Sequence, residues 1–143
     1  MIEIIAEPID IQRVVASVTV PEAGAIDLFL GTTRNHSSGK EVLSLNYEAY
    51  VPMAIKMMEY IAREIRDRRN VHKISIVHRI GIVPISEASV AIAVSASHRN
   101  EAFEACHYAI DELKKRVPIW KKEIFEDGEM WVENARTKRW RTK

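Results

Sequence analysis

The sequence predicts an α+β domain built from amphipathic helices and half-buried or fully buried strands. Residues 103–117 place apolar side chains at alternating spacings of three and four, which is typical of one helix face. Residues 42–50 alternate apolar and polar side chains, as a half-buried strand does. Residues 88–97 are apolar or small on both faces, which indicates a central strand. No linker, repeat or low-complexity tract interrupts residues 1–143, so we expect a single domain.

Two helices and a strand are predicted around the half-buried strand of the N-terminal half. Asp10 can cap a short helix, and residues 25–33 have the pattern of a strand. The turn-forming residues at 32–40 then predict a polar loop. Pro52 is expected to begin the second helix. The apolar stripe of this helix consists of Ala54, Met57, Met58, Ile61 and Ile65.

The C-terminal half is predicted to contain two strands, a helix and a hairpin. The strands cover 71–80 and 88–97, with a connection at 81–87 between them. Asn100 is the expected N-cap of the helix, and Pro118 should end it. The Asp-Gly pair within 126–129 is suited to a hairpin turn. The apolar stripe of the helix consists of Phe103, Cys106, Ile110, Leu113 and Val117.

Composition narrows the class of protein. Lys and Arg number 21 against 20 Asp and Glu, a net charge of +1, which disfavours a nucleic-acid coat but allows a local basic site. Cys106 is the only cysteine, so no intramolecular disulfide forms, and a reducing compartment is favoured. With no membrane-length apolar run and no basic leader, we expect a cytoplasmic protein. The basic tail at 136–143 is expected either to be flexible or to wrap around a partner.

Cationic residues on both sides of the last helix predict an anion-binding site. His98 and Arg99 fall between a buried strand and the helix N-terminus, where free amides and an arginine favour phosphate or carboxylate. The alternative is a surface arginine beside a histidine packed over the strand end. Arg34 lies in a polar loop directly after a strand, where a rigid scaffold often places binding residues. Its alternative is a solvated loop arginine.

Two lysines near Pro118 are candidates for chemistry. Lys114 follows the core position Leu113 and therefore borders the buried stripe. Such a lysine either extends its stem along apolar surface or is partly desolvated, which would free an amine for nucleophilic or acid–base work. Lys121 lies beyond the proline, beside Trp120, which could fix its direction. Lys115, Arg116 and Lys122 are assigned mainly to solvent.

Other site classes find little support in the sequence. The histidines show no metal-type pairing and no Cys/His cluster exists, so we expect no metal site. Dinucleotide-binding, Walker A and nucleophile-elbow motifs are absent, and we expect no bound cofactor. Cys106 lies on the apolar stripe and is interpreted as a packing residue.

Six ordered blocks of residues resemble one family over nearly the whole chain. They are Gly31–His36, Leu45–Tyr50 with Met53-Ala54, His78–Gly81, Ser89–Arg99 with Ala102-Phe103, Asp111–Lys114, and Pro118–Glu123 followed by Asp127-Gly128 and Trp131. In this combination the chain resembles the large, catalytic subunit of molybdopterin synthase. The resemblance implies an α/β hammerhead-type domain with an additional antiparallel sheet.

The same resemblance implies partners and a reaction. Two large subunits would form a central dimer, with a small ubiquitin-like subunit at each end to complete a heterotetramer. The C-terminal Gly-Gly tail of the small subunit would carry a thiocarboxylate into a pocket of the large one. Sulfur would pass twice to cyclic pyranopterin monophosphate, forming the dithiolene of molybdopterin.

The resemblance also assigns site residues. Thr32, Thr33 and Arg34 would line the pterin pocket. His98 and Arg99 would bind the substrate phosphate across the dimer interface. Lys114 would be the principal catalytic amine, with Lys121 as a second acid–base or electrostatic residue. The remaining substrate-binding residues would be Lys122 and Glu123.

One departure and one alternative remain. The family usually has Gly-Glu before the central strand, where this chain has Ser86-Glu87. Glycine is favoured there if the turn needs positive φ, so serine suggests a changed turn type. The alternative is a non-catalytic, dimeric α+β module that grips a nucleotide or RNA phosphate through Arg34, His98, Arg99 and the basic tail. Against it, no paired aromatic residues suggest an RNA-stacking platform.

Overall fold

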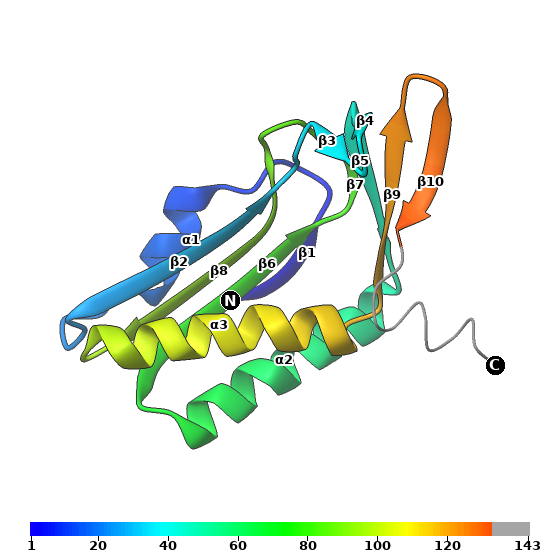
Figure 1. Ribbon diagram of the computed structural model, residues 1–143. Coiled ribbons are helices and arrows are strands. Elements are labelled where there is room, and N and C mark those ends of the chain that lie inside the picture. The colour runs from blue at the N-terminus through cyan, green and yellow to red at the C-terminus, as the bar shows by residue number, and fades with distance from the viewer. Residues whose placement is uncertain (133–143) are drawn as a thin grey trace.

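The computed structural model describes residues 1–132 and contains two four-stranded sheets joined at an angle (Figure 1). The first sheet has the order β1 (Ile2–Ile5), β6 (Val71–Arg79), β8 (Ala88–Ala96) and β2 (Ala25–Thr32). The second has the order β10 (Gly128–Val132), β9 (Ile119–Phe125), β5 (Ser44–Ala49) and β7 (Gly81–Pro84). A small ribbon pairs β3 (His36–Ser37) with β4 (Lys40–Glu41).

Three helices occur in the described residues, and they cover both faces of the first sheet. The helices are α1 (Ile11–Val18), α2 (Val51–Arg68) and α3 (Arg99–Arg116). Figure 1 shows α2 and α3 side by side on one face and α1 on the other. The α+β prediction is confirmed, and so is the additional antiparallel sheet, since every pairing in the second sheet is antiparallel. None of these helices is long and apolar enough to cross a membrane.

Alternation along the central strands creates two cores, one on each face. Val90, Ile92 and Val94 of β8 face α2 and α3, whereas Ala91 and Ala93 face α1. Strand β8 lies between β6 and β2, so its predicted central position is confirmed. Burial of both faces explains why the strand has no polar side.

The buried stripe of α3 differs from the predicted one. Phe103 is 54% exposed, and Ile110 is only partly buried. The face against the sheet instead carries small residues, which let the helix approach the strands closely. The buried side chains of α3 are Ala102, Ala105, Cys106, Ala109 and Leu113.

The start of α3 also differs from the prediction. His98, not Asn100, occupies the N-cap position, and its side chain makes no capping hydrogen bond within residues 1–132. The helix therefore begins directly after the two-residue bend that follows the buried strand. The other end follows the prediction, because Val117 is the C-cap immediately before Pro118.

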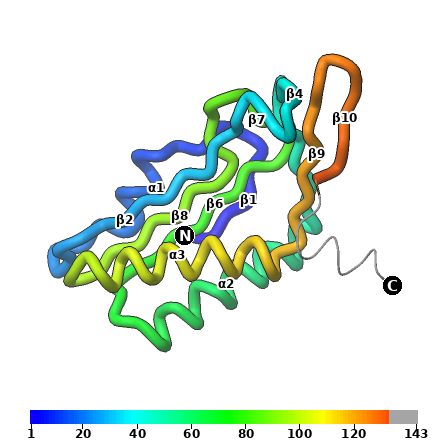
Figure 2. The backbone as a smooth tube through the Cα atoms, viewed as in Figure 1, coloured from blue at the N-terminus to red at the C-terminus, as the bar shows by residue number. Residues whose placement is uncertain are grey.

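The segment predicted as a connection at 81–87 contains a strand. Gly81 has φ = +86° and makes the corner at which the chain leaves β6 and enters β7 of the second sheet. Glycine adopts this conformation without the Cβ clash that other residues meet. Figure 2 shows the chain also passing directly from α3 into β9. The two sheets are thus joined by very short connections.

Other differences concern the ends of the chain. Strand β1 was not predicted, because Ile-Glu-Ile-Ile is too short to show a clear period. It pairs in parallel with β6, more than 65 residues away in sequence. The hairpin turn at 126–129 is confirmed by the antiparallel pairing of β9 and β10. The basic tail at 136–143 lies outside the described residues.

Candidate active site

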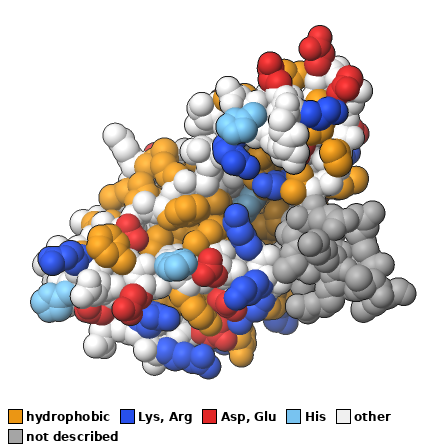
Figure 3. Space-filling view, viewed as in Figure 1, with side chains coloured by type: hydrophobic (Ala, Val, Ile, Leu, Met, Phe, Trp, Pro, Cys, Tyr) orange, Lys and Arg blue, Asp and Glu red, His pale blue; other side chains and the backbone are white. Residues whose placement is uncertain are grey.

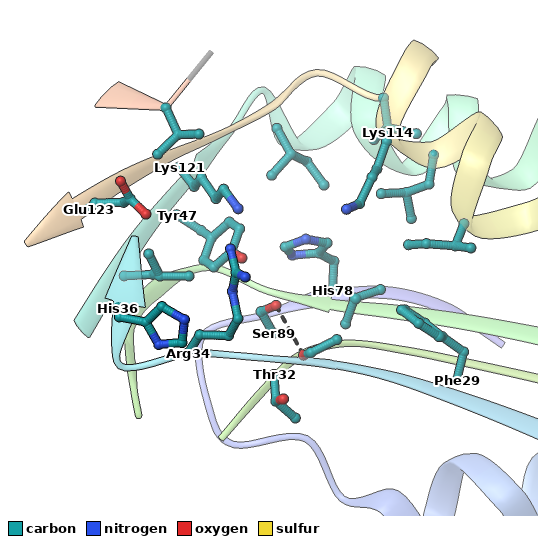
Figure 4. Close-up of a pocket in the computed structure, with 18 residues that line it drawn as sticks. Phe29, Thr32, Arg34, His36, Tyr47, His78, Ser89, Lys114, Lys121 and Glu123 are labelled. Atoms are coloured by element: carbon teal, nitrogen blue, oxygen red, sulfur yellow. Dashed lines mark hydrogen bonds between the residues drawn. The ribbon is translucent and has the colours of Figure 1, made fainter. Parts of the chain in front are cut away.

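A cavity of about 300 Å³ lies where the two sheets meet the C-terminal end of α3. Figure 4 shows side chains from the two sheets, from the loop after β2 and from α3 pointing into it. In Figure 3, Lys and Arg side chains gather around the hollow at this junction. The polar residues that line it are Thr32, Arg34, His36, Tyr47, His78, Ser89, Lys114, Lys121 and Glu123.

The register of the second sheet brings part of the site together. Tyr47 lies directly opposite Lys121, and Leu45 lies opposite Glu123. Because side chains alternate along a strand, all four face the cavity. Lys122 falls on the other face, where its Nζ lies 3.2 Å from a carboxylate oxygen of Glu129. Lys122 thus does not line the cavity, although the family resemblance assigned it to substrate binding.

Lys121 is the amine that this environment perturbs. Burial lowers its pKa below that of an ordinary lysine, and the positive charges of Lys114 and Arg34 lower it further. The carboxylate of Glu123 opposes this shift. The sequence left open whether Lys114 extends its stem along apolar surface or is partly desolvated; the structure favours the first alternative, because the side chain is exposed in the last turn of α3. A cation is favoured there by the helix dipole.

A bulge at the end of β2 positions the loop that carries Arg34. The register with β8 shifts between Gly31 and Thr32, so that Thr32 lines the cavity. A Cβ at Gly31 would lie 2.7 Å from Cγ1 of Val90, so the bulge has no room for a side chain. Thr33, predicted to line the pocket, is instead buried beside it, and its hydroxyl donates to the carbonyl of Val83 at 3.4 Å.

The turn at 84–87 holds the loop that carries Arg34 in place through backbone hydrogen bonds. The amide of Ser86 donates to the Thr33 carbonyl at 2.9 Å, and the Thr33 amide donates to the Glu87 carbonyl at 3.1 Å. Ser86 has φ = +70°, so the predicted change of turn type is wrong: serine accepts the left-handed conformation that glycine would adopt freely. Buried Arg79 pairs with the Glu87 carboxylate at 2.7 Å and holds the turn against the first sheet.

His98 and Arg99 do not join the other cations. Both are exposed at the N-terminal end of α3, and neither lines the cavity. With a rise of about 1.5 Å per residue, they lie roughly 22 Å from Lys114 along the helix axis. Within one chain these residues and the lysines therefore do not meet at one ligand, and the expected contact across a dimer interface stays a prediction. The length of α3 separates these two residues from Lys114, and the fact that all of them flank or belong to one helix did not reveal that distance.

Four lining residues were missed as site residues: His36, Tyr47, His78 and Ser89. All four belong to the blocks that carry the family resemblance, which was the available signal. Burial raises the pKa of Tyr47, and a hydrogen bond with Ser89 partly offsets this shift.

Other candidate chemistry has little support in the described residues. Burial raises the pKa of Cys106 to about 12, which agrees with its interpretation as a packing residue. No group of three or more His, Cys, Asp or Glu side chains within 1–132 is arranged to hold a metal ion.

Comparison with known proteins agrees with the resemblance. Residues 4–116 match the family model of the MoaE protein. The molybdopterin synthase catalytic subunit of Arabidopsis thaliana is 49% identical over 137 residues, which cover 94% of this chain and 69% of that one. Molybdopterin synthase from Staphylococcus aureus superposes with a TM-score of 0.88 at 43% identity, covering 92% of this chain and 96% of that one.

A complex of subunits 1 and 2 of the molybdopterin-converting factor from Helicobacter pylori shares the fold. Its TM-score is 0.77 at 20% identity, covering 92% of this chain and 90% of that one. The names of the more similar relatives favour an enzyme subunit over a phosphate-binding module. The chain therefore belongs to the MoaE family of molybdopterin synthase catalytic subunits.

Proposed function

We propose that this chain transfers sulfur from the C-terminal thiocarboxylate of a small ubiquitin-like subunit to cyclic pyranopterin monophosphate. Two transfers give the dithiolene of molybdopterin, and each leaves the donor as a carboxylate. The observation that carries the proposal is the convergence of Arg34, Lys114 and Lys121 on one cavity. Donor and substrate are both anions, so a cationic cavity suits both.

The two lysines take different roles in this proposal. Lys114 is exposed at the rim, where an incoming thiocarboxylate can reach it, and it holds this anion as a point charge. Lys121 lies deeper, and its lowered pKa makes a neutral amine more accessible near neutral pH. Lys121 is therefore the better group for moving a proton when substrate bonds break.

Preorganised charge supplies the main catalytic effect. Arg34 and the two lysines are in place before substrate arrives, so they can stabilise negative charge without reorganisation. Glu123 faces the same cavity, and its charge favours the protonated form of Lys121. The net shift of the Lys121 pKa is still downward, so this lysine gives up its proton more readily than an ordinary one.

His98 and Arg99 serve the cavity of a second copy of the chain in this proposal. Within one chain they lie too far from the cavity, yet they sit beside the uncapped first turn of α3, where a phosphate is favoured. A dimer that apposes this end of α3 to the partner's cavity would add a phosphate grip to the site. A small subunit docked on each copy then gives the heterotetramer.

The small subunit is proposed by analogy with the two-subunit complex from Helicobacter pylori. The cavity lies at the junction of the sheets, and an extended Gly-Gly tail has no side chains to hinder its entry. The tail would end beside Lys114.

Reconstitution tests this function. The purified chain, a thiocarboxylated small subunit and the cyclic pterin should yield dithiolene product, with two donor molecules consumed per product. The control replaces the thiocarboxylate by a carboxylate and should yield none. A wild-type chain that makes no product, under conditions in which the Staphylococcus aureus enzyme does, contradicts the proposal.

A further inference from the structure

A buried imidazole faces the cavity without a role in the chemistry described above. His78 lies near the end of β6 and is 4% exposed, yet it is one of the lining residues. Figure 4 shows its ring directed into the cavity between Tyr47 and Lys114. Most buried polar groups pair within the protein, so a ring nitrogen directed into a cavity indicates a ligand contact.

The position of the proton on this ring follows from its neighbour. Nδ1 lies 2.9 Å from the backbone carbonyl oxygen of Arg79. A carbonyl oxygen can only accept, so Nδ1 must carry the hydrogen. In the neutral ring, Nε2 then bears a lone pair, and the structure records no hydrogen bond for it within residues 1–132.

Two contacts fix the direction of this lone pair. The Arg79 carbonyl anchors one side of the ring, and the ring of Tyr47 packs edge-on against it with centroids 5.0 Å apart and planes at 68°. Burial lowers the pKa of His78 to about 4, so the ring is neutral at pH 7. Nε2 is thus a fixed hydrogen-bond acceptor.

The surroundings show which kind of ligand atom suits such an acceptor. Lysine and arginine side chains only donate hydrogen bonds, so Arg34, Lys114 and Lys121 complement the anionic parts of a ligand. A lone pair repels an anionic oxygen and attracts an N–H. The apolar part of the lining suits an uncharged planar ring; it includes Phe29, Val90, Leu113, Val117 and Ile119.

We propose that Nε2 of His78 accepts a hydrogen bond from an N–H of the pterin ring and so fixes the orientation of the substrate. The inference rests on the function proposed above. The cavity then has two chemically distinct parts: cations for phosphate and thiocarboxylate, and a neutral acceptor for the heterocycle. His78 is a specificity-determining residue, because a ligand without a donor at this point leaves Nε2 unpaired.

Two isosteric variants separate this role from a structural one. In His78→Asn, the side-chain amide can still donate to the Arg79 carbonyl, but the acceptor toward the cavity is lost. In His78→Gln, the longer side chain can place an oxygen near the position of Nε2, but it loses the anchor. With the small subunit saturating, we expect His78→Asn to raise KM for the pterin about tenfold. His78→Gln should recover most of this loss, and KM for the small subunit should not change in either variant.

The outcomes are distinguishable. A His78→Asn enzyme with wild-type KM, or a His78→Gln enzyme worse than His78→Asn, shows that the ring is structural and overturns the inference. A wild-type chain that makes no product refutes the proposed function instead. Calorimetric binding of the pterin to wild type and to His78→Asn then decides the inference separately: equal affinities, or no binding to either, overturn it.

A measurement on the wild-type chain covers variants that fail to fold. Nitrogen-15 spectra of labelled histidine should show His78 with a protonated Nδ1 and an unprotonated Nε2 in the free protein. Adding the pterin should shift the Nε2 resonance toward that of a hydrogen-bonded nitrogen. An Nε2 resonance that does not respond to bound pterin overturns the inference.

Discussion

Helix α3 carries cations at both ends, but only its C-terminal end lies beside the second sheet. At that end Lys114 meets β9 and the loop after β2, which contribute Lys121 and Arg34 to one cavity. At the other end, His98 and Arg99 are exposed. The same residue types therefore form a site at one end and an open surface at the other.

The difference shows what converts surface charge into a reactive group. Lys121 is partly buried beside two other cations, and its pKa falls. Burial and like charge act together there because the two sheets enclose the amine. Within residues 1–132 the second sheet lies at the C-terminal end of α3 (Figure 1), so cations at the N-terminal end can attract an anion but are not enclosed around it.

Lys114→Ala should have the largest effect, and it tests whether the cations at the C-terminal end of α3 form the active site. We expect turnover to fall by at least about 10³-fold, because a preorganised positive charge beside the transferred sulfur is lost. The exposed side chain makes little contact with the core, so dimer formation and thermal unfolding should not change. Steady-state dithiolene formation gives the measurement.

Lys115→Ala is the matched control. Its side chain points to solvent, and its amine lies 3.6 Å from a carboxylate oxygen of Glu112 on the same helix. Exposed pairs of this kind contribute little. Near-normal turnover in Lys114→Ala, or a large loss in Lys115→Ala, would remove Lys114 from its proposed role.

Lys121→Met tests the effect of enclosure. We expect turnover to fall about 10²-fold, the usual size of one acid–base contribution. Below its lowered folded-state pKa, the wild-type lysine is protonated in a site that disfavours its charge, so the variant should be more stable at pH 7. As pH rises toward the ordinary lysine value, the wild type recovers stability and this advantage should shrink. Denaturant unfolding at several pH values measures it, and an advantage that grows with pH would contradict the assignment.

Mixing two inactive variants tests whether the exposed end of α3 serves a partner. In a hybrid dimer of Arg99→Ala and Lys114→Ala chains, one cavity has Lys114 and receives Arg99 from the other copy. Random pairing makes half of the dimers hybrid with one intact site each, so about a quarter of wild-type activity should return. No recovery after subunit exchange would mean that Arg99 does not act across an interface.

The smallest expected effect concerns the turn behind the Arg34 loop. Ser86→Gly relieves a left-handed serine at φ = +70° but makes the unfolded chain more flexible. The net result should be a stabilisation of about 0.5–1 kcal/mol. Thermal unfolding measures it, and Ser44→Gly, at a regularly paired position of β5, is the control that should destabilise. A destabilised Ser86→Gly chain would show that the side chain supports the turn.

Local sequence patterns predicted most of the helices and strands, because such patterns depend only on residues that are close together in the chain. Pro118 ended a helix and Asp127-Gly128 made a hairpin, as backbone preferences require. The stripe of α3 was predicted less well, because hydrophobicity alone cannot show that a close helix–sheet contact needs Ala102 and Ala105 where Phe103 would be too large.

The candidate site could be predicted only in part from the sequence, because part of it depends on packing between distant segments. Lys114, Lys121 and Arg34 could be selected by type and position, and the structure places all three on one cavity. The separation of His98 from them depends on where the second sheet packs, and the burial of Lys121 depends on the β5–β9 register. Neither is a local property of the chain.

The parallel pairing of β1 with β6 has a consequence for folding. Residues 2–5 cannot find their partner until the chain through 79 is available, and that strand must itself be arranged beside β8. Closing so long a loop is entropically costly, so this edge of the sheet should form late, after the β6–β8 hairpin has nucleated. During synthesis, the first strand would wait as an unpaired apolar segment, at which a chaperone or an aggregation partner could compete with the native edge.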